Sequence, residues 1–285
     1  MSIARPTAKG KKEIQLTTKP PGITMDEKGG IGMKITTYNL RCVYDKDGAN
    51  SFIHRVGMIY DKIKAEQPDV IAFQEVVPQE LEVLEKLLTE YSWVGQARDT
   101  DYDGEGLFTA VRKETCQLLG FETIWLSPTP YLPGSRYAHQ SDCPRICVQA
   151  LVRHKQSKTV LRVFNLHLDH ISAEARVAGI QAALDFTESY HSRDGHPVVI
   201  LGDFNALPEE ESITICNNHP GIQDVTANIA GTFHNFGRRT PPPKIDYIYM
   251  SDVLAEKVQQ VQTWEDEKNG IYLSDHYPVC AELAL

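Results

Sequence analysis

Short apolar runs recur along the chain from Met33 to the C-terminus, and most of them stop abruptly at a polar residue. Runs of this length that are rich in Val, Ile, Leu and Phe are typical of strands buried in a sheet. The predicted strands are residues 33–40, 69–74, 93–95, 107–111, 146–152, 160–166, 198–201, 244–250 and 279–283.

Apolar residues at helical spacing predict helices between several of these strands. One stripe contains Phe52, Val56, Ile59 and Ile63, and Pro68 ends that helix. A second helix is predicted to begin at Pro78, with its inner side formed by Leu81, Leu84, Leu87 and Leu88.

Two further helices follow from their N-terminal signals. Ser172 is a typical N-cap, and the helix after it runs to about Tyr190. Pro208 fits the first turn of the other helix, where Glu209 and its two acidic neighbours favour the positive helix end.

The most informative pattern is the set of polar residues at strand ends. Gly202 permits a bend or close approach after the strand Val198–Leu201, and Asp203 and Asn205 are predicted to point the same way on an extended chain. Asp246 lies near the start of another strand and needs a buried partner. The strand-end residues are Asn39, Glu75, His167, Asp203, Asn205, Asp275 and His276.

Each of these residues, taken alone, also fits a cap or a turn. Their repeated occurrence at strand ends favours one shared polar reaction site instead. Loop residues add substrate-binding candidates: Arg145 and His139 from the irregular segment 128–145, and His234 from the stretch GTFHNF. An ordinary surface arginine is the alternative interpretation for Arg145. The acidic segment 98–106 lacks calcium-loop spacing and is predicted to be a surface loop.

Composition narrows the possible partners. The chain has 285 residues, a net charge of -9 and a pI of about 5.6. This balance argues against a broad surface for duplex nucleic acid, although a local basic pocket or a metal ion is compatible with it. No apolar run is long enough to cross a bilayer, so no membrane partner is expected.

Residues 1–32 are poor in large apolar side chains and are predicted to form a flexible arm, followed by one domain over residues 33–285. No secretory signal is visible, so we expect a cytoplasmic protein whose six cysteines are free thiols. The spacing of Cys143 and Cys147 does not match the common zinc ribbon.

Six ordered motifs carry a family resemblance: MKITTYNLR, AFQEV, FNLHLD, LGDFNA, KIDYIYMS and LSDHYPV. Together they resemble the endonuclease/exonuclease/phosphatase superfamily, which has the deoxyribonuclease I-like fold. The resemblance covers about Met33 to Leu285. The stretches FETIWLSPTPYLPGSR, CPRI and GTFHNF are similar to one branch of small proteins in that superfamily. The resemblance implies a four-layer α/β/β/α sandwich, with two mixed sheets face to face and helices outside.

The resemblance also implies a divalent-metal phosphohydrolase. Glu75 would be the main metal ligand, helped by Asn39 and Asp275, and such oxygen ligands favour Mg²⁺ or Mn²⁺. The family pattern further implies a set of catalytic positions. Asp203 would orient or deprotonate the attacking water, and Asn205 would hold the phosphate. His276, paired with Asp246, would face the scissile phosphate, and His167 would be a second imidazole there.

Three functions follow as hypotheses. The first is a phosphodiesterase that acts on nucleic acid or nucleotides by in-line attack of water. The second is a phosphomonoesterase that acts on a small sugar or inositol phosphate. The third, a non-catalytic binding protein, is disfavoured because every expected catalytic position is filled. In the first two hypotheses the partner is a phosphorylated substrate, and the sequence does not give the oligomeric state.

Overall fold

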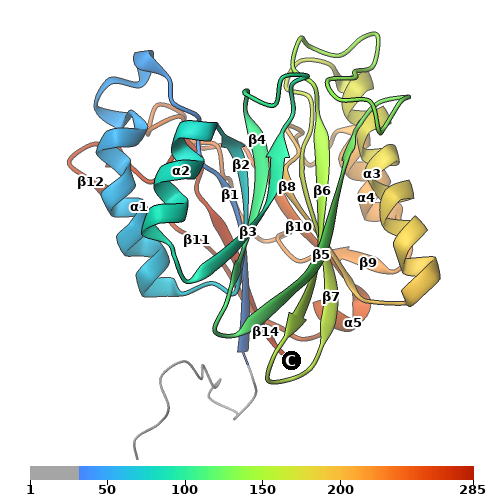
Figure 1. The fold of residues 1–285 in the computed structure, drawn as a ribbon. Coiled ribbons are helices and arrows are strands. Elements are labelled where there is room, and N and C mark those ends of the chain that lie inside the picture. Colours follow the sequence, from blue (N-terminus) through green and yellow to red (C-terminus); the bar gives the residue numbers. More distant parts are fainter. Residues whose placement is uncertain (1–31) are drawn as a thin grey trace, which may run out of the picture.

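Two six-stranded sheets packed face to face form the centre of the molecule (Figure 1). The computed structural model describes residues 32–285, so the predicted arm lies, except for Gly32, outside the described residues. Helices cover the outer face of each sheet, which gives four layers. The predicted α/β/β/α sandwich is therefore confirmed.

The first sheet has the strand order β11-β14-β1-β2-β4-β3. Strands β1 and β2 are parallel, and the other neighbours in this sheet are antiparallel. Its strands are β1 (Gly32–Asn39), β2 (Val70–Val76), β3 (Tyr91–Ala97), β4 (Gly106–Arg112), β11 (Val258–Thr263) and β14 (Val279–Ala284).

The second sheet has the order β5-β6-β7-β8-β10-β9, with β7 and β8 parallel and the other neighbours antiparallel. Its strands are β5 (Cys116–Trp125), β6 (Ile146–His154), β7 (Val160–His167), β8 (Val198–Asp203), β9 (Ile222–Asp224) and β10 (Asp246–Ser251). A separate small ribbon contains β12 (Glu267–Lys268) and β13 (Ile271–Tyr272).

Two helices cover each sheet (Figure 1). Helices α1 (Phe52–Glu66) and α2 (Pro78–Leu87) cover the first sheet, and α3 (Ala173–Asp194) and α4 (Glu211–Asn218) cover the second. The 3₁₀ helix η1 (Asp45–Asn50) precedes α1, and α5 (Asp252–Ala255) follows β10. Among the described residues, no helix combines the length and the apolar character that crossing a membrane requires.

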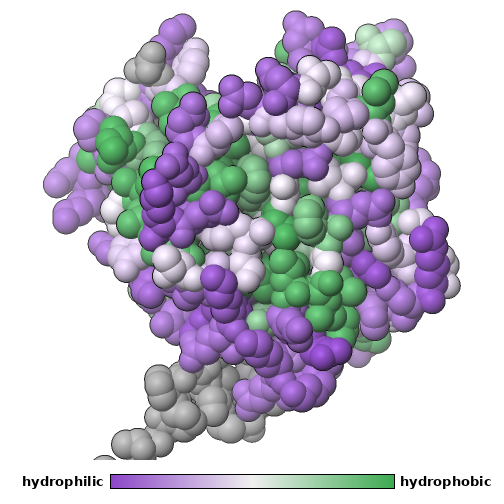
Figure 2. Space-filling view, in the orientation of Figure 1, coloured by the Kyte–Doolittle hydropathy of each residue, from purple (hydrophilic) through white to green (hydrophobic). Residues whose placement is uncertain are grey.

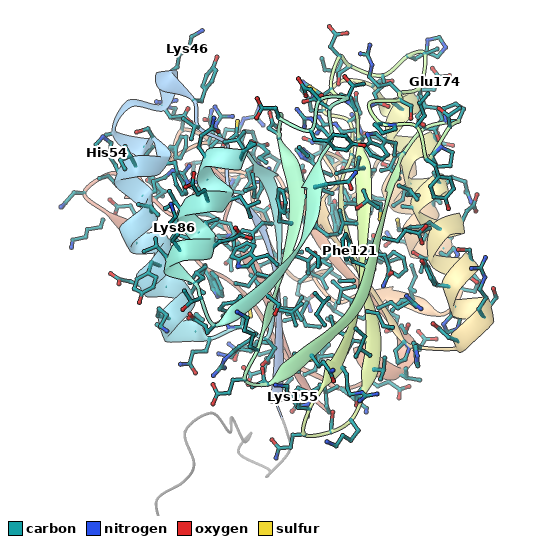
Figure 3. All side chains as sticks on the ribbon, viewed as in Figure 1. Lys46, His54, Lys86, Phe121, Lys155 and Glu174 are labelled. Carbon is teal, nitrogen blue, oxygen red and sulfur yellow. The ribbon has the colours of Figure 1, made fainter. Side chains whose placement is uncertain are left out.

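Strand β5 was missed, and two local predictions were wrong. Strand β5 was not predicted because it is an edge strand with apolar residues on both faces; Phe121, labelled in Figure 3, is 53% exposed. Helix α4 begins at Glu211 and not at Pro208, because the side chain of Glu210 accepts a hydrogen bond from the backbone of Leu207 and holds a turn there. The predicted inner residue Leu87 is 39% exposed.

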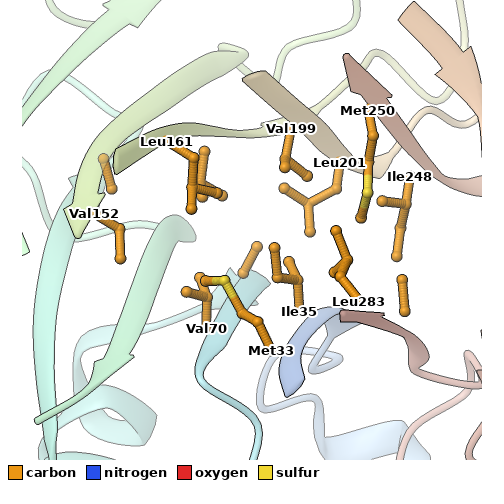
Figure 4. Packing of buried hydrophobic residues seen from close by; sticks show 14 of the residues in the cluster. Met33, Ile35, Val70, Val152, Leu161, Val199, Leu201, Ile248, Met250 and Leu283 are labelled. Atoms are coloured by element: carbon orange, nitrogen blue, oxygen red, sulfur yellow. The ribbon is translucent and has the colours of Figure 1, made fainter. Parts of the chain in front are cut away.

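The principal hydrophobic core lies between the two sheets (Figure 4). Met33, Ile35 and Val70 of the first sheet face Val199 and Leu201 of the second, and all five are at most 1% exposed. Separate apolar clusters join each sheet to its own helices. Burial of this continuous apolar surface is the main force that holds the sheets together.

A small polar network interrupts this apolar interface. Gln74 of β2 donates from Nε2 to Oδ1 of Asn165 on β7 at 2.8 Å, and Asn165 donates from Nδ2 to the carbonyl oxygen of Phe73 at 3.0 Å. Thr37 of β1 donates to Oε1 of Gln74 at 3.3 Å. Because these side chains are almost fully buried, each depends on the others for its hydrogen bonds.

Replacing one member of this network should therefore destabilise the protein more than replacing both amides. We expect Asn165→Leu to lower the free energy of unfolding by about 2–4 kcal/mol, because the Gln74 amide loses its partner in a dry interior. The double variant Gln74→Leu with Asn165→Leu should recover part of that loss. Urea denaturation of the four proteins measures both effects, and strictly additive losses would contradict the role given to the bridge.

Candidate active site

Six of the seven strand-end residues line one cavity of about 440 Å³ at the upper edge of the sandwich, and the seventh, Asn39, is buried beside it. In the space-filling view this edge dips between the loop after β1 and the β5–β6 loop (Figure 2). Lys46 lies on the rim at this end and Lys155 lies at the opposite end (Figure 3). Of the predicted site residues, the cavity is lined by Glu75, Arg145, His167, Asp203, Asn205, Asp275 and His276.

Strand pairing in the second sheet brings three of the predicted residues into one row. His167 of β7 is the register partner of Asp203 of β8, and Asp203 is in turn the partner of Asp246 on β10. The three residues are at most 5% exposed. Residues that are far apart in the sequence are therefore direct neighbours at the sheet edge.

The first sheet contributes Glu75 through an irregular backbone. Strand β2 has a register shift between Phe73 and Val76, and Glu75 has a positive φ of 59°. Asn39, at the end of β1, donates from Nδ2 to Oε1 of Glu75 at 2.9 Å and to Oδ2 of Asp203 at 3.0 Å. Its amide therefore joins the carboxylates of the two sheets.

A turn, and not an extended strand, brings Asn205 to Asp203. Asn205 has a φ of 49°, and its backbone N–H donates to Oδ1 of Asp203 at 2.8 Å, so the predicted extended geometry was wrong. Its side chain lies 3.0 Å from Nε2 of His167 and donates to the carbonyl of Leu168. Gly202 has a φ of 148°, and a Cβ there would collide with the Leu166 carbonyl, as the expected close approach requires.

His276 is paired with a buried carboxylate. Its Nδ1 lies 2.8 Å from Oδ2 of Asp246, and its Nε2 faces Oδ2 of Asp203 at 3.9 Å. Burial alone would lower the pKa of His276, but the charge and hydrogen bond of Asp246, with the charge of Asp203, raise it to about 10. His276 is therefore a buried cation at neutral pH.

The second imidazole, that of His167, is neutral. Burial, followed by the nearby charges of Arg145 and Arg98, lowers the pKa of His167 well below its usual value. Its Nε2 lies 3.5 Å from Oδ2 of Asp203. One neutral and one charged imidazole thus face the same carboxylate, which gives the site both a hydrogen-bonding and a charged partner for an anion.

The carboxylates also differ in their proton affinity. Burial and the charge of Asp246 raise the pKa of Asp203 to about 7. Burial opposes ionisation of Glu75 too, but the hydrogen bond from Asn39 and the charges of His276 and Arg41 outweigh it and lower the pKa of Glu75. Glu75 is therefore ionised at neutral pH, whereas Asp203 can take up or release a proton there.

The donors beside Glu75 fit a hard divalent cation. Asp275 contributes a second carboxylate and Asn39 an amide oxygen, which also accepts from the backbone N–H of Arg41. The thiol of Cys42 lies beside them, but burial and the charge of Glu75 raise its pKa, so it stays protonated. Oxygen donors without a thiolate suit Mg²⁺ or Mn²⁺ better than zinc.

Arg55 connects the two segments that carry Asn39 and Asp275. It is fully buried on α1 and donates to four backbone carbonyls at 2.7–2.9 Å. None of the carboxylates that the structure describes pairs with it. These carbonyls belong to Leu40, Arg41, Asn50 and Leu273. The guanidinium therefore fixes the loop after β1 against the segment that precedes Asp275.

The cavity also contains residues that the sequence analysis missed. Segment 98–106 was predicted to be a surface loop, but Arg98 and Glu105 at its ends line the cavity, together with Arg41, His170 and Phe233. Glu105 directly precedes β4, which is antiparallel to β2, so the start of β4 meets the end of β2 at the same edge. The position of Glu105 directly before an apolar run indicates that it lies at the end of a strand. Placing that end at the site would also have required the direction of the strand.

Two of the three substrate-binding candidates do not reach the cavity. His139 is exposed in the β5–β6 loop. His234 is buried, its ring stacks on Tyr277 with centroids 4.0 Å apart, and its backbone N–H donates to the carbonyl oxygen of Asp275. His234 thus supports the turn that carries Asp275 and His276, and Arg145 alone of the three lines the cavity.

Comparison with known proteins identifies the family. The model of the Endonuclease/Exonuclease/phosphatase family matches residues 36–276, a range that includes every strand-end residue described above. An uncharacterized protein of Acanthamoeba polyphaga mimivirus is 25% identical over 247 residues, which cover 79% of this chain and 90% of that protein.

Two similar solved structures span nearly the same part of the chain. A functionally unknown conserved protein from Enterococcus faecalis is 31% identical with a TM-score of 0.80, over 88% of this chain and 99% of that one. The mannosyl-6-phosphatase Bt3783 of Bacteroides thetaiotaomicron is 25% identical with a TM-score of 0.81, over 89% of this chain and 100% of that one. The chain therefore belongs to the endonuclease/exonuclease/phosphatase family, whose members hydrolyse phosphoesters.

Proposed function

We propose that this protein is a divalent-metal-dependent phosphohydrolase that cleaves a small phosphate ester by in-line attack of water. The observation that carries the proposal is the position of Asp203. Its two oxygens accept hydrogen bonds from Asn39 and Asn205. Two imidazoles face it, one neutral and one positively charged. This arrangement provides a base, phosphate-binding groups and a metal-binding edge in one cavity.

In this proposal Glu75 is the main metal ligand, with Asn39 and Asp275 beside it. A bound Mg²⁺ or Mn²⁺ would supply positive charge that offsets the charge developing on the phosphoryl oxygens. Arg41 is placed to hold Asp275 in position, since its Nε lies 3.7 Å from that carboxylate and 2.9 Å from Asp47.

Asp203 is the group that orients the attacking water and accepts its proton. Its raised pKa of about 7 suits this task, because a general base works best when its pKa is close to the operating pH. The hydrogen bonds from Asn39 and Asn205 fix the carboxylate, so the water is held in one direction.

Asn205, His167 and His276 form the phosphate-binding side. The Asn205 amide and the His167 ring are 3.0 Å apart and together present polar groups to a phosphoryl oxygen. His276 adds a positive charge, which Asp246 maintains through its hydrogen bond to Nδ1. Charge of this kind, fixed in advance in a buried site, stabilises the more negative transition state.

A phosphomonoester of a small molecule is the substrate that we favour. The cavity has the size of a small-molecule site, and the net charge of -9 opposes a long nucleic acid. The mannosyl-6-phosphatase that resembles this chain at 25% identity supports the same choice.

A phosphodiester of a nucleotide or a short single strand is the second candidate. Tyr44 lines the cavity and is 43% exposed, so its ring is available to stack on a base. The same catalytic residues would serve either ester, and the difference between them lies in what the cavity wall contacts.

Removal of the proposed base should abolish turnover without unfolding the protein. We expect Asp203→Ala to lower kcat by roughly 10²–10⁴-fold, the usual contribution of an acid–base group. The measurement is release of product, with Mg²⁺ or Mn²⁺, from p-nitrophenyl phosphate, bis(p-nitrophenyl) phosphate, a sugar phosphate panel and a labelled oligonucleotide. Chelation with EDTA should have the same effect, and re-added metal should restore activity to the wild type only.

The exposed Asp185→Ala on α3 is the matched control and should behave as the wild type. Circular dichroism of both variants checks the fold. Turnover by Asp203→Ala within a few-fold of the wild type would refute the assignment of the base, and activity that EDTA leaves unchanged would refute the metal dependence.

The charge state of His276 gives a test that needs no substrate. In metal-free protein we expect its ring to titrate near pH 10, since Asp246 stabilises the protonated form. Asp246→Asn removes that charge, so the pKa should fall, by roughly one to three units. The ring signals in an NMR titration report this value, with Asp185→Asn as the control. An unchanged midpoint in Asp246→Asn would show that the pair does not set the charge of His276.

A further inference from the structure

One wall of the cavity is basic. Arg98 follows β3, Arg145 precedes β6 and His170 follows β7, so three separate segments bring these residues together. We call these three residues the basic wall. They line the same cavity as His167 and Glu75, and therefore face the place where a reacting phosphoryl group would be held.

Arg145 is a buried cation with unused hydrogen-bond donors. It is 4% exposed, and its Nη2 lies 2.8 Å from Nδ1 of His170. Its Nε lies 3.8 Å from Oδ2 of Asp169, which is too far for a hydrogen bond. Both Nε and Nη1 are buried and have no hydrogen-bond partner among residues 32–285. A guanidinium that pays the cost of burial and then lacks partners is unfavourable unless a ligand completes its bonding.

Arg98 has the same deficiency. Its Nη1 pairs with Oε2 of Glu105 at 2.8 Å, but its buried Nε has no hydrogen-bond partner in the described part of the chain. The charge of Arg98 also opposes that of Arg145: burial and then Arg98 lower the pKa of Arg145. Two buried guanidinium groups therefore lie near each other with only one firm ion pair between them.

The carboxylates around the basic wall are already engaged. Asp169 accepts hydrogen bonds from the Ser141 hydroxyl and from the backbone N–H groups of Ile171 and Ser172. Glu105 is bound to Arg98. A small space of about 10 Å³ lies beside Arg98, Arg145 and Glu105 and has room for about one water. A larger anion must therefore approach from the main cavity.

We propose that the basic wall binds the terminal oxygens of the substrate phosphoryl group and so selects phosphomonoesters over phosphodiesters. The inference rests on the proposed function and names the residues that would select its substrate class. A monoester phosphate has one more charged terminal oxygen than a diester and can fill the unused donors. In a diester that oxygen carries carbon, which would leave buried N–H groups unpaired, and mismatches of this kind discriminate strongly.

The first test is binding of inorganic phosphate, measured by isothermal titration calorimetry on the full chain. We expect Arg145→Gln to weaken phosphate binding about 10-fold or more, because charge-assisted hydrogen bonds are lost. Arg145→Lys keeps the charge but lacks the planar guanidinium, so its affinity for phosphate should lie between those of the wild type and Arg145→Gln. The control is Arg153→Gln, an exposed arginine at the other end of the same strand, which should bind phosphate as the wild type does.

The second test compares two esters with the same leaving group. For p-nitrophenyl phosphate, kcat/KM should fall about 100-fold in Arg145→Gln, but for methyl p-nitrophenyl phosphate by less than about 5-fold. Because a buried arginine can also be needed for folding, His170→Ala is the second variant: His170 is exposed, and its loss should shift the same ratio in the same direction. Thermal unfolding monitors the fold of each variant.

The outcomes separate this inference from the proposed function. Three results would each overturn the selection by the basic wall. They are an equal loss of kcat/KM on the two esters in Arg145→Gln, unchanged phosphate binding in that variant, and a wild type that prefers the diester. A wild type that hydrolyses neither ester, yet binds phosphate through Arg145, would refute the proposed function and leave the anion site standing.

Discussion

The hydrogen bonds that cross between the two sheets are the constraint on which the site depends. Apolar packing between the sheets is strong but not directional, so by itself it would tolerate sliding of one sheet over the other. The Gln74–Asn165 pair and the bond from Asn39 to Asp203 connect the sheets at fixed points, one directly beneath the site and one within it. Because buried amides cannot find other partners, these contacts set the alignment that places Glu75 opposite Asp203.

Near these hydrogen bonds, chemically similar side chains have different protonation states. Glu75 and Asp203 are both buried carboxylates, yet hydrogen bonding lowers the pKa of one while burial and a like charge raise that of the other. His276 and His167 differ in the same way, since one has a carboxylate partner and the other has arginine neighbours. Local partners, and not residue type, therefore decide which group can hold a metal, accept a proton or support negative charge.

The cavity consequently has two unlike walls. The acidic wall, made of Glu75, Asp203 and Asp275, suits a divalent cation, whereas the basic wall suits an anion. A phosphate ester placed between them would have its oxygens near a cation on each side, and water would meet phosphorus from the Asp203 side. The Arg55 guanidinium supports the Asp275 side of this wall from behind, because it binds carbonyls of the loop after β1 and of the segment that precedes Asp275.

The sequence by itself determined most of the central strands and helices and the chemical type of the site. Apolar runs that end in Asn39, Glu75, His167 and Asp203 were visible without a structure. Buried strands need branched apolar residues, and charge is excluded until the strand emerges. Only the tertiary structure decided which of these residues are neighbours: the row His167–Asp203–Asp246 depends on strand register, which the local sequence does not encode. For the same reason Arg98 and Glu105 were assigned to a surface loop, and His139 and His234 were selected although they do not line the cavity. Asn205 was predicted in an extended geometry, but it lies in a turn. Position in the chain shows what a side chain can do, and packing in space decides what it meets.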